Sequence, residues 1–305
     1  MSMQQDKRVQ FDFEVEFLNG GGVQGQGFRL DIEGEHIEDQ ALADYIVRDL
    51  RLLMVGRVRI LNKNIITEPH KRNSQVPAAA VDAGSRLIDL SHTIEDGMIT
   101  YKGLPAPLIC DHLSRVQSRQ LYAPGTEFQI GKITMVSNTG TYLDSPFHRY
   151  ADGADLAALR LQSLAGLEGV LIRVTGMAGK AIPREAFVAE NLRAKAVLVR
   201  TGWDRHWRTD RYFEGHPFLT AGAADYLRES GVALVGIDSY NIDDITDGNR
   251  PVHTSLLGAG IPIVEHMRGL EQLPASGFRF SAVPPKILGM GTFPVRAFAT
   301  LSGST

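Results

Sequence analysis

A carboxylate and a histidine lie close together in residues 137–153, SNTGTYLDSPFHRYADG, where Pro146 stands between Asp144 and His148. A helix does not carry this pair across a proline, but a proline-stiffened turn can bring the two side chains together. Carboxylate oxygen and imidazole nitrogen are ligands that suit zinc or manganese. The segment is therefore a candidate metal site, and the alternative is a loop histidine whose hydrogen bonds are satisfied by its surroundings.

Two later segments place chemically capable side chains at the ends of apolar runs. Asp238 follows VALVGI, and we expect its carboxylate to orient a ligand through a hydrogen bond. His253 lies in RPVHTSLLGAG, and Glu265 follows IPIV, where an ionised carboxylate needs a partner or a metal ion. The alternative for Glu265 is a helix N-terminus, whose dipole favours a carboxylate. The pair Asp243 and Asp244 is expected in a solvated loop.

Short apolar runs separated by loops must position these side chains. The runs AVLVR and VALVGI are continuous and apolar, which predicts strands buried on both faces. RLIDL, FQIGKITMVS and GVLIRV are further strand candidates. Residues 220–231, TAGAADYLRESG, predict a helix that ends at Gly231. This part of the chain is therefore predicted to have a mixed α/β fold.

The N-terminal part has a different pattern. Residues 9–17 alternate between apolar and polar side chains, which predicts a half-buried strand, and residues 38–54 repeat apolar positions at helical spacing. GGGVQGQGF is expected as a glycine-rich turn, because it lacks the Lys-Ser/Thr of a phosphate-binding loop. We expect a small α+β domain over residues 1–70, a linker over 71–85 and the α/β domain over 86–305.

Composition limits the classes of function. The chain has 305 residues, of which 43% are apolar and 22% charged, and its formal net charge is −3. This charge gives no electrostatic basis for binding nucleic acid or an anionic membrane. We see no apolar run of the roughly 18 residues that a membrane span needs, and no leader peptide. Cys110 is the single cysteine, which excludes an internal disulfide framework and a cysteine-based zinc cluster. We expect a cytoplasmic protein that acts on a small molecule.

Residues 86–300 resemble the cyclase family of metal-dependent hydrolases, whose best-known members are the bacterial kynurenine formamidases. The family signature H-x-G-T-H-x-D-x-P-x-H stands here as NTGTYLDSPFH. The later segments RTGW, GIDS, PVHTSLLGAGIPIVE and GTFPVRAFA match in the same order. The resemblance implies a swivelling β/β/α domain around a mixed β-sheet, and a homodimer or homotetramer.

The resemblance also implies the roles of individual residues. His148 would be the catalytic acid/base, and the metal ligands would be Asp144, His253 and Glu265. A bound zinc or manganese ion would bring the pKa of its water towards ~7 and polarise a carbonyl group. His148 would then carry the proton to the leaving group. The implied reaction is hydrolysis of a small formamide, amide, lactam or lactone.

Two positions depart from the family signature. Asn138 and Tyr142 replace its leading histidines, and an amide oxygen or a neutral phenol is a weak ligand for zinc. We therefore expect at most one divalent ion, with Asn138, Tyr142 and Asp238 binding substrate. Two alternatives stay open: a metal-free cyclase or dehydratase that uses Tyr142, His148 and Asp144, and a ligand-binding protein without catalysis.

Overall fold

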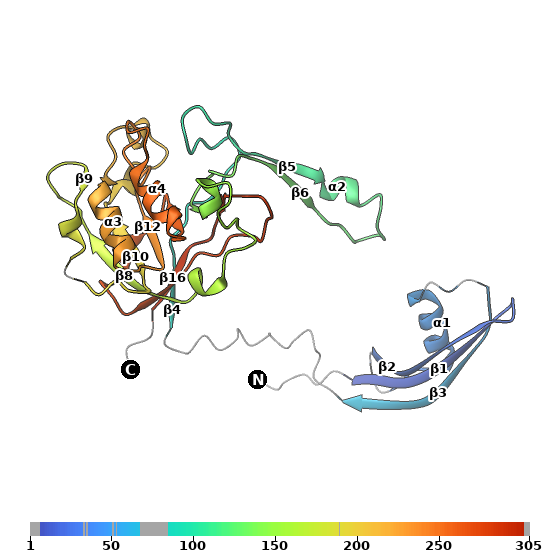
Figure 1. Ribbon diagram of the computed structural model, residues 1–305. Helices are drawn as coiled ribbons and strands as arrows, with labels where there is room; N and C mark the ends of the chain where they lie inside the picture. Colours follow the sequence, from blue (N-terminus) through green and yellow to red (C-terminus); the bar gives the residue numbers. More distant parts are fainter. Residues whose placement is uncertain are drawn as a thin grey trace. The chain divides into compact units, whose positions relative to one another are not determined.

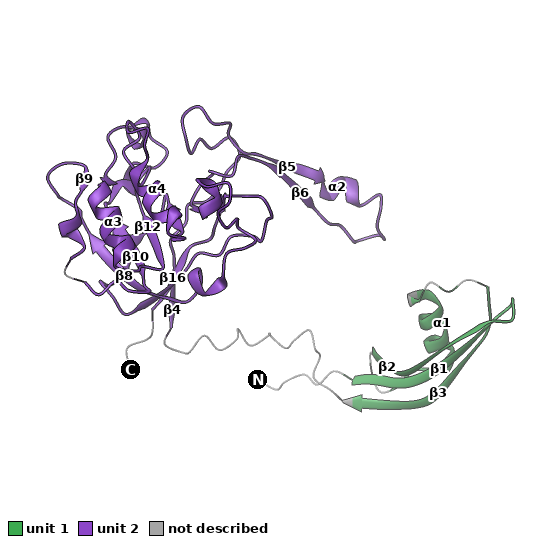
Figure 2. Cartoon of the chain, viewed as in Figure 1, with its two compact units in different colours: residues 1–81 green, residues 82–305 purple. Residues whose placement is uncertain are grey.

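The computed structural model describes residues 7–67, apart from positions 33, 35, 51 and 53, and residues 85–301, apart from position 189. The chain divides into two compact units, unit 1 over residues 1–81 and unit 2 over residues 82–305 (Figure 2). The predicted linker, residues 71–85, lies outside the described residues apart from Ser85. The two units are described separately below.

Unit 1 is a three-stranded antiparallel sheet with one helix. Its strands follow the order β2-β1-β3. The elements are β1 (Lys7–Phe17), β2 (Gly22–Asp31), α1 (Asp39–Asp49) and β3 (Val55–Thr67). The alternating residues of β1 pack against the helix, and the buried core consists of Val9, Phe11, Phe13, Val15, Leu42 and Ile46. The strand and the helix were predicted, although the helix is shorter than residues 38–54.

The prediction that GGGVQGQGF is a turn is wrong for most of its length. Strand β2 begins at Gly22, which pairs with Glu16 of β1. Gly25 pairs with Phe13, and a Cβ atom at Gly25 would come within 2.4 Å of the Phe13 ring. The glycine at this position therefore makes room for a core aromatic side chain, and the tight turn lies before the strand.

Unit 2 is built around a nine-stranded mixed sheet in the order β15-β7-β13-β12-β10-β8-β14-β16-β4. The central strands β8, β10, β12 and β13 run parallel, and the outer strands pair antiparallel. The strands are β4 (Arg86–Asp89), β7 (Tyr142–Asp144), β8 (Leu167–Arg173), β10 (Ala196–Arg200), β12 (Leu234–Ile237), β13 (Ile263–Glu265), β14 (Phe278–Ser281), β15 (Thr292–Pro294) and β16 (Phe298–Leu301). The predicted mixed α/β fold is confirmed.

The two faces of this sheet have separate hydrophobic cores. Helices α3 (Ala221–Glu229) and α4 (Pro251–Gly258) cover one face, where Leu227 and Leu256 pack with Val197 and Ile237 of the strands (Figure 1). The core on the other face contains Leu171, Leu198 and Leu234 of the central strands, together with residues of β14 and β16. The predicted strands AVLVR and VALVGI are thus buried on both faces, as parallel strands covered on two sides should be.

Shorter elements complete unit 2. Strands β9 (Ala181–Ile182) and β11 (Phe218–Leu219) pair with each other. The 3₁₀ helices are η1 (Pro146–His148), η2 (Leu161–Ser163), η3 (Arg184–Ala186), η4 (Trp203–His206), η5 (Asp210–Phe213) and η6 (Leu270–Gln272). Among the described residues, no helix is both long and apolar enough to span a membrane.

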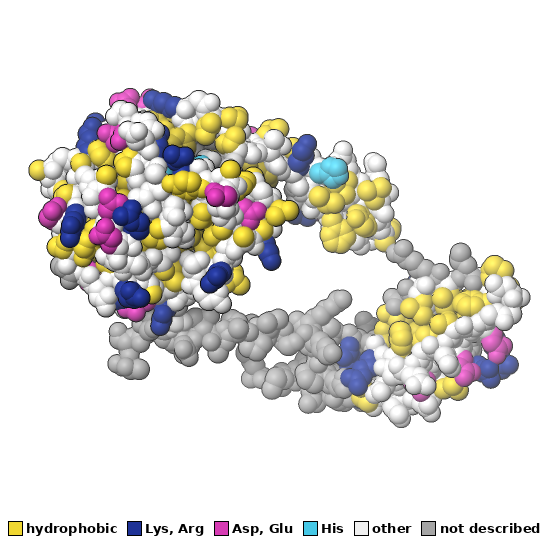
Figure 3. Space-filling model, in the orientation of Figure 1, with side chains coloured by type: hydrophobic (Ala, Val, Ile, Leu, Met, Phe, Trp, Pro, Cys, Tyr) yellow, Lys and Arg dark blue, Asp and Glu magenta, His cyan; other side chains and the backbone are white. Residues whose placement is uncertain are grey.

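A hairpin projects from the rest of unit 2, and we call residues 108–134 the arm (Figure 1). It consists of β5 (Leu108–Leu113), the short helix α2 (Arg115–Ser118) and β6 (Ile130–Thr134). Apolar side chains gather over β5 and β6 (Figure 3). Large apolar side chains with exposed fractions of 37% to 68% are Leu108, Ile109, Val116, Leu121, Tyr122, Phe128, Ile130 and Ile133.

Candidate active site

Adjacent strands β7 and β13 position two carboxylates and a phenol. Their antiparallel register places Tyr142 opposite Glu265 and Asp144 opposite Ile263. Side chains alternate along a strand, so Leu143 enters the core while Tyr142 and Asp144 point to the other face. The exposed fractions of Asp144 and Glu265 are 0% and 1%. The sheet thus holds both carboxylates in a buried place.

The first turn of α4 adds an imidazole. The Asp243 carboxylate accepts hydrogen bonds from the backbone N–H groups of Val252 and His253 at 2.7 and 3.0 Å, and lies 2.6 Å from His253 Nδ1. Amides in the first turn of a helix have no partner within the helix. The Asp243 carboxylate therefore both caps α4 and orients the imidazole ring of His253. His253 Nε2 lies 3.6 Å from Asp144 Oδ2 and 3.9 Å from Glu265 Oε1. Burial opposes protonation, but the nearby carboxylates of Asp144 and Asp243 raise the pKa of His253 above its usual value.

His148 stands beside this group, on the 3₁₀ helix that begins at Pro146. Thr292, opposite Asp144 in the register of β15 and β7, donates its hydroxyl proton to the Asp144 carboxylate. The same oxygen lies 2.8 Å from His148 Nδ1. A hydroxyl has one proton, so the oxygen of Thr292 accepts from Nδ1–H, and Nε2 of the neutral ring is left unprotonated. The His148 side chain is 36% exposed, so it is open to solvent and ligand.

A hydrogen-bond network fixes Glu265. The Tyr142 hydroxyl donates to Glu265 Oε2 at 2.7 Å, and the backbone N–H of Ile242 donates to Oε1 at 2.6 Å. The Tyr101 hydroxyl lies 3.2 Å from that of Tyr142 and accepts from Asn241 Nδ2 at 2.7 Å. Burial and the charge of Glu265 raise the pKa of Tyr142 well above its usual value, so this phenol stays a neutral donor. Burial also raises the pKa of Glu265.

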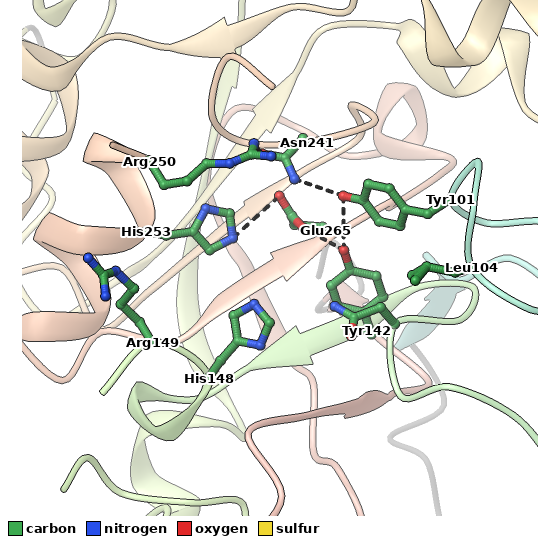
Figure 4. Close-up of a pocket in the computed structure, with 10 residues that line it drawn as sticks. Tyr101, Leu104, Tyr142, His148, Arg149, Asn241, Arg250, His253 and Glu265 are labelled. Atoms are coloured by element: carbon green, nitrogen blue, oxygen red, sulfur yellow. Dashed lines mark hydrogen bonds and ion pairs between the residues drawn. The ribbon is translucent and has the colours of Figure 1, made fainter. Parts of the chain in front are cut away.

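These side chains meet at a pocket of about 330 Å³ (Figure 4). That volume is in the range for a small organic ligand. Its lining consists of Tyr101, Leu104, Asn138, Tyr142, His148, Arg149, Asn241, Arg250, His253 and Glu265. We call Tyr142, Asp144, His253 and Glu265 the floor. Asp144 is buried behind the lining, within 3.7 Å of donor atoms on both His148 and His253.

The donor atoms fit a single divalent ion. Asp144 Oδ2 is buried without a hydrogen-bond partner among the described residues, which is costly for a carboxylate oxygen unless a cation faces it. One donor atom from each of Asp144, His148 and His253 lies within 4.8 Å of the others. Glu265 is an alternative third contact through Oε1, although both its oxygens accept hydrogen bonds. Imidazole and carboxylate donors suit zinc or manganese.

The structure brings most of the predicted site residues together, with one exception. Asn138 and Tyr142 both line the pocket, as predicted for residues that bind substrate. Asp238 is not in that lining. Its buried carboxylate accepts hydrogen bonds from the backbone N–H and the hydroxyl of Thr201 at 2.7 and 2.6 Å, and from the N–H of Gly202 at 2.9 Å. Asp238 therefore ties the ends of two strands together, away from the pocket.

Sequence reasoning missed several residues of the site. The expectation that Asp243 is solvated is wrong, because its side chain is 0% exposed and caps α4. A signal was present: Pro251 is typical of a first helical position, and a carboxylate upstream of it can serve the free amides. The other missed lining residues are Tyr101, Leu104, Arg149, Asn241 and Arg250.

Comparison with known proteins agrees with the geometry. The Cyclase family model matches residues 88–244. Kynurenine formamidase from Bacillus cytotoxicus is 30% identical over 169 residues, covering 55% of this chain and 78% of the relative. Kynurenine formamidase from Bacillus anthracis is 27% identical over 216 residues, covering 70% of this chain and 96% of the relative.

A solved structure has the same fold. Isatin hydrolase A from Labrenzia aggregata superposes with a TM-score of 0.62 at 21% identity, covering 72% of this chain and 94% of that one. At this identity the likeness concerns the fold. The family model covers more than half of the chain, and the resemblance seen in the sequence is thereby confirmed. The chain belongs to the cyclase family.

Proposed function

We propose that this chain is a metal-dependent hydrolase that cleaves the C–N bond of a small amide, such as a formamide or a lactam, with a related lactone as a further substrate type. One observation carries the proposal: the unpartnered, buried Asp144 Oδ2 lies 3.6 Å from His253 Nε2. The names of the relatives, kynurenine formamidase and isatin hydrolase, support amide hydrolysis as the reaction class. The chain is therefore an enzyme that acts on C–N bonds other than peptide bonds.

Asp144 and His253 would hold the ion, with a third contact from Glu265, because the free nitrogen of His148 is used for proton transfer. When bound, a zinc or manganese ion activates water at neutral pH and polarises the substrate carbonyl. Asp243 fixes the Nδ1 side of His253, so that Nε2 is the nitrogen presented to the ion. Tyr142 holds Glu265 in place by its hydrogen bond.

His148 moves the proton in this proposal. Its Nδ1–H is held by Thr292, so Nε2 takes the proton of the attacking water and delivers it to the leaving nitrogen. The amide and one water become an acid and an amine, and the ring of His148 ends neutral, as it began. Because the C–N bond breaks only when nitrogen receives this proton, His148 is the acid/base.

Metal content and turnover test the proposal together. Purified protein should contain close to one zinc or manganese per chain by elemental analysis. It should hydrolyse N-formylkynurenine, isatin or a simple lactone, lose that activity to a chelator and regain it on addition of the metal. Full activity of metal-free protein would favour a metal-free enzyme, and absence of both metal and turnover would favour a ligand-binding protein.

A further inference from the structure

Two arginines of the pocket have no role in the chemistry described above. Arg149 follows η1, and Arg250 directly precedes α4, and both line the pocket. In Figure 4 their guanidinium groups flank His253. The rest of the lining near them is neutral or belongs to the floor. The question is which part of a ligand these two cations face.

Neither guanidinium forms an ion pair with an acidic side chain of the described residues within 4.0 Å. Arg149 Nε donates to Thr254 Oγ1 at 3.3 Å, and Arg250 Nη1 donates to Asn241 Oδ1 at 3.2 Å. Both acceptors are neutral. A guanidinium carries five N–H donors, so each arginine keeps donors for a further acceptor. Its planar fork matches a carboxylate.

The backbone of Arg250 is strained. Its φ and ψ angles are 49° and 58°, in the left-handed region that a residue with a Cβ atom rarely adopts. The next residue is Pro251, and the ring of a proline disfavours helical backbone angles in the residue before it. The conformation starts α4 at Pro251 while Arg250 stays in the pocket lining. Strain of this kind is concentrated where a side chain has to be held in place for function.

The charges of the pocket set the direction of a bound ligand. The floor carries the carboxylates Asp144 and Glu265, and Asp243 lies behind His253. With one divalent ion bound, its charge would balance the two floor carboxylates, so the two arginines are the remaining cations of the lining and attract an anionic group. Apolar Leu104 lines the same pocket. A ligand with an acidic group at one end and a neutral acyl group at the other fits this polarity.

We propose that Arg149 and Arg250 bind a carboxylate of the substrate, so that the natural substrate is a small amide carrying an acidic group away from the scissile bond. This inference rests on the proposed function for the identity of the scissile group. The arginines position the substrate and take no part in the bond breaking.

A matched series of aryl formamides tests it. Formanilide is neutral, and its ortho, meta and para carboxylates add only the acidic group. At least one carboxylate should exceed formanilide in kcat/KM. Arg250→Asn, which keeps a residue tolerant of left-handed angles, and Arg149→Gln should each reduce that kcat/KM about ten- to a hundredfold, mainly through KM, because charge-assisted hydrogen bonds are lost. Turnover of formanilide should change little.

Controls separate binding from folding. Arg160→Gln removes an exposed arginine outside the pocket lining and should leave the whole series unchanged. Arg250→Lys should restore part of the loss, because it keeps the charge but not the fork. Equal kcat/KM for formanilide and every carboxylate in the wild-type enzyme would overturn the inference. Equal losses on neutral and acidic substrates in the arginine variants would also overturn it.

Calorimetry decides the matter if no formamide is cleaved, which would refute the proposed function with these substrates. The aminobenzoates, the amine products of the series, should bind more tightly than aniline, and the Arg149→Gln, Arg250→Asn double variant should lose that difference. Such a result would support the carboxylate site independently of turnover. Aminobenzoates that bind no better than aniline would refute it.

Discussion

Asp144 and Glu265 of the pocket floor are buried carboxylates, whereas Phe128 and Ile133 of the arm are apolar side chains exposed by 52% and 56%. Folded proteins usually place these residue types the other way round. In the floor, Tyr142 and both oxygens of Glu265 have hydrogen-bond partners, whereas Asp144 Oδ2 is buried without one among the described residues. In the arm, the strands β5 and β6 pair with each other and have no buried core.

The two departures from the usual distribution have different explanations. A buried carboxylate oxygen without a hydrogen-bond partner is costly, and under the proposed function the floor offsets this cost by holding a small ion. An isolated two-stranded hairpin is marginal in water, so the arm needs a protein surface to cover it. The predictions below test each explanation, beginning with the largest expected effect.

Asp144→Asn should lower hydrolytic activity by about 10³-fold or more and remove the bound metal, because an amide oxygen is a poor substitute for a buried carboxylate oxygen that has no partner among the described residues. Elemental analysis and kcat/KM measure the two effects. Asp152→Asn, the same change at an exposed position, is the control. A metal-loaded, active Asp144→Asn protein would show that the floor is no metal site.

His148→Ala should lower kcat by about 10²–10⁴-fold, which is the usual contribution of a positioned proton donor and acceptor. The melting temperature should hold, since the side chain is 36% exposed and fills no core. His112→Ala, at an exposed histidine of the arm, should leave turnover unchanged. Near wild-type turnover in His148→Ala would rule out the acid/base role.

Asp243→Asn should weaken metal binding and activity by about 10- to 100-fold, because the residue that orients a ligating imidazole is lost. Titration of metal into apoprotein gives the affinity. The neighbouring change Asp244→Asn affects a carboxylate that hydrogen-bonds Thr246 and should have no such effect. Equal effects of the two changes would mean that Asp243 does not act through His253.

The double change Asn138→His with Tyr142→His restores the family signature and should raise metal affinity or stoichiometry. Tyr142 now donates to Glu265 Oε2, and an imidazole would replace that donor by a metal ligand. Elemental analysis of protein dialysed against limiting chelator detects the gain. Two tightly held ions already present in the wild type would contradict the account of a single-ion site.

The arm should mediate self-association, which we expect to give a homodimer or homotetramer. A symmetric pair lets each copy cover the other's arm. Ile133→Glu should shift the mass in solution towards the 33.4 kDa of one chain, as light scattering after size exclusion can measure. The adjacent change Lys132→Glu alters charge without removing an apolar contact and serves as the control. A wild-type monomer at micromolar concentration would refute this role.

Local patterns in the sequence were enough to predict much of this protein. Alternation along residues 9–17 and the apolar runs AVLVR and VALVGI determine strands, because a strand's buried faces follow from its side-chain pattern alone. The turn that joins Asp144 to His148 follows from Pro146. The family resemblance, through its signature and the later segment PVHTSLLGAGIPIVE, predicted that Asp144, His148, His253 and Glu265 lie together, and the structure brings them together.

Contacts between distant segments were decided only by the tertiary structure. Tyr142 bonds Glu265 because β7 and β13 pair in one register, although the residues are 123 positions apart. Asp243 is buried because the first amides of α4 donate hydrogen bonds to its carboxylate. Arg250 lines the pocket because its backbone adopts left-handed angles. Register, helix capping and backbone strain depend on how the elements pack, and packing is a property of the whole chain. The family pattern predicted the candidate metal ligands, and the packing determined which other side chains surround them.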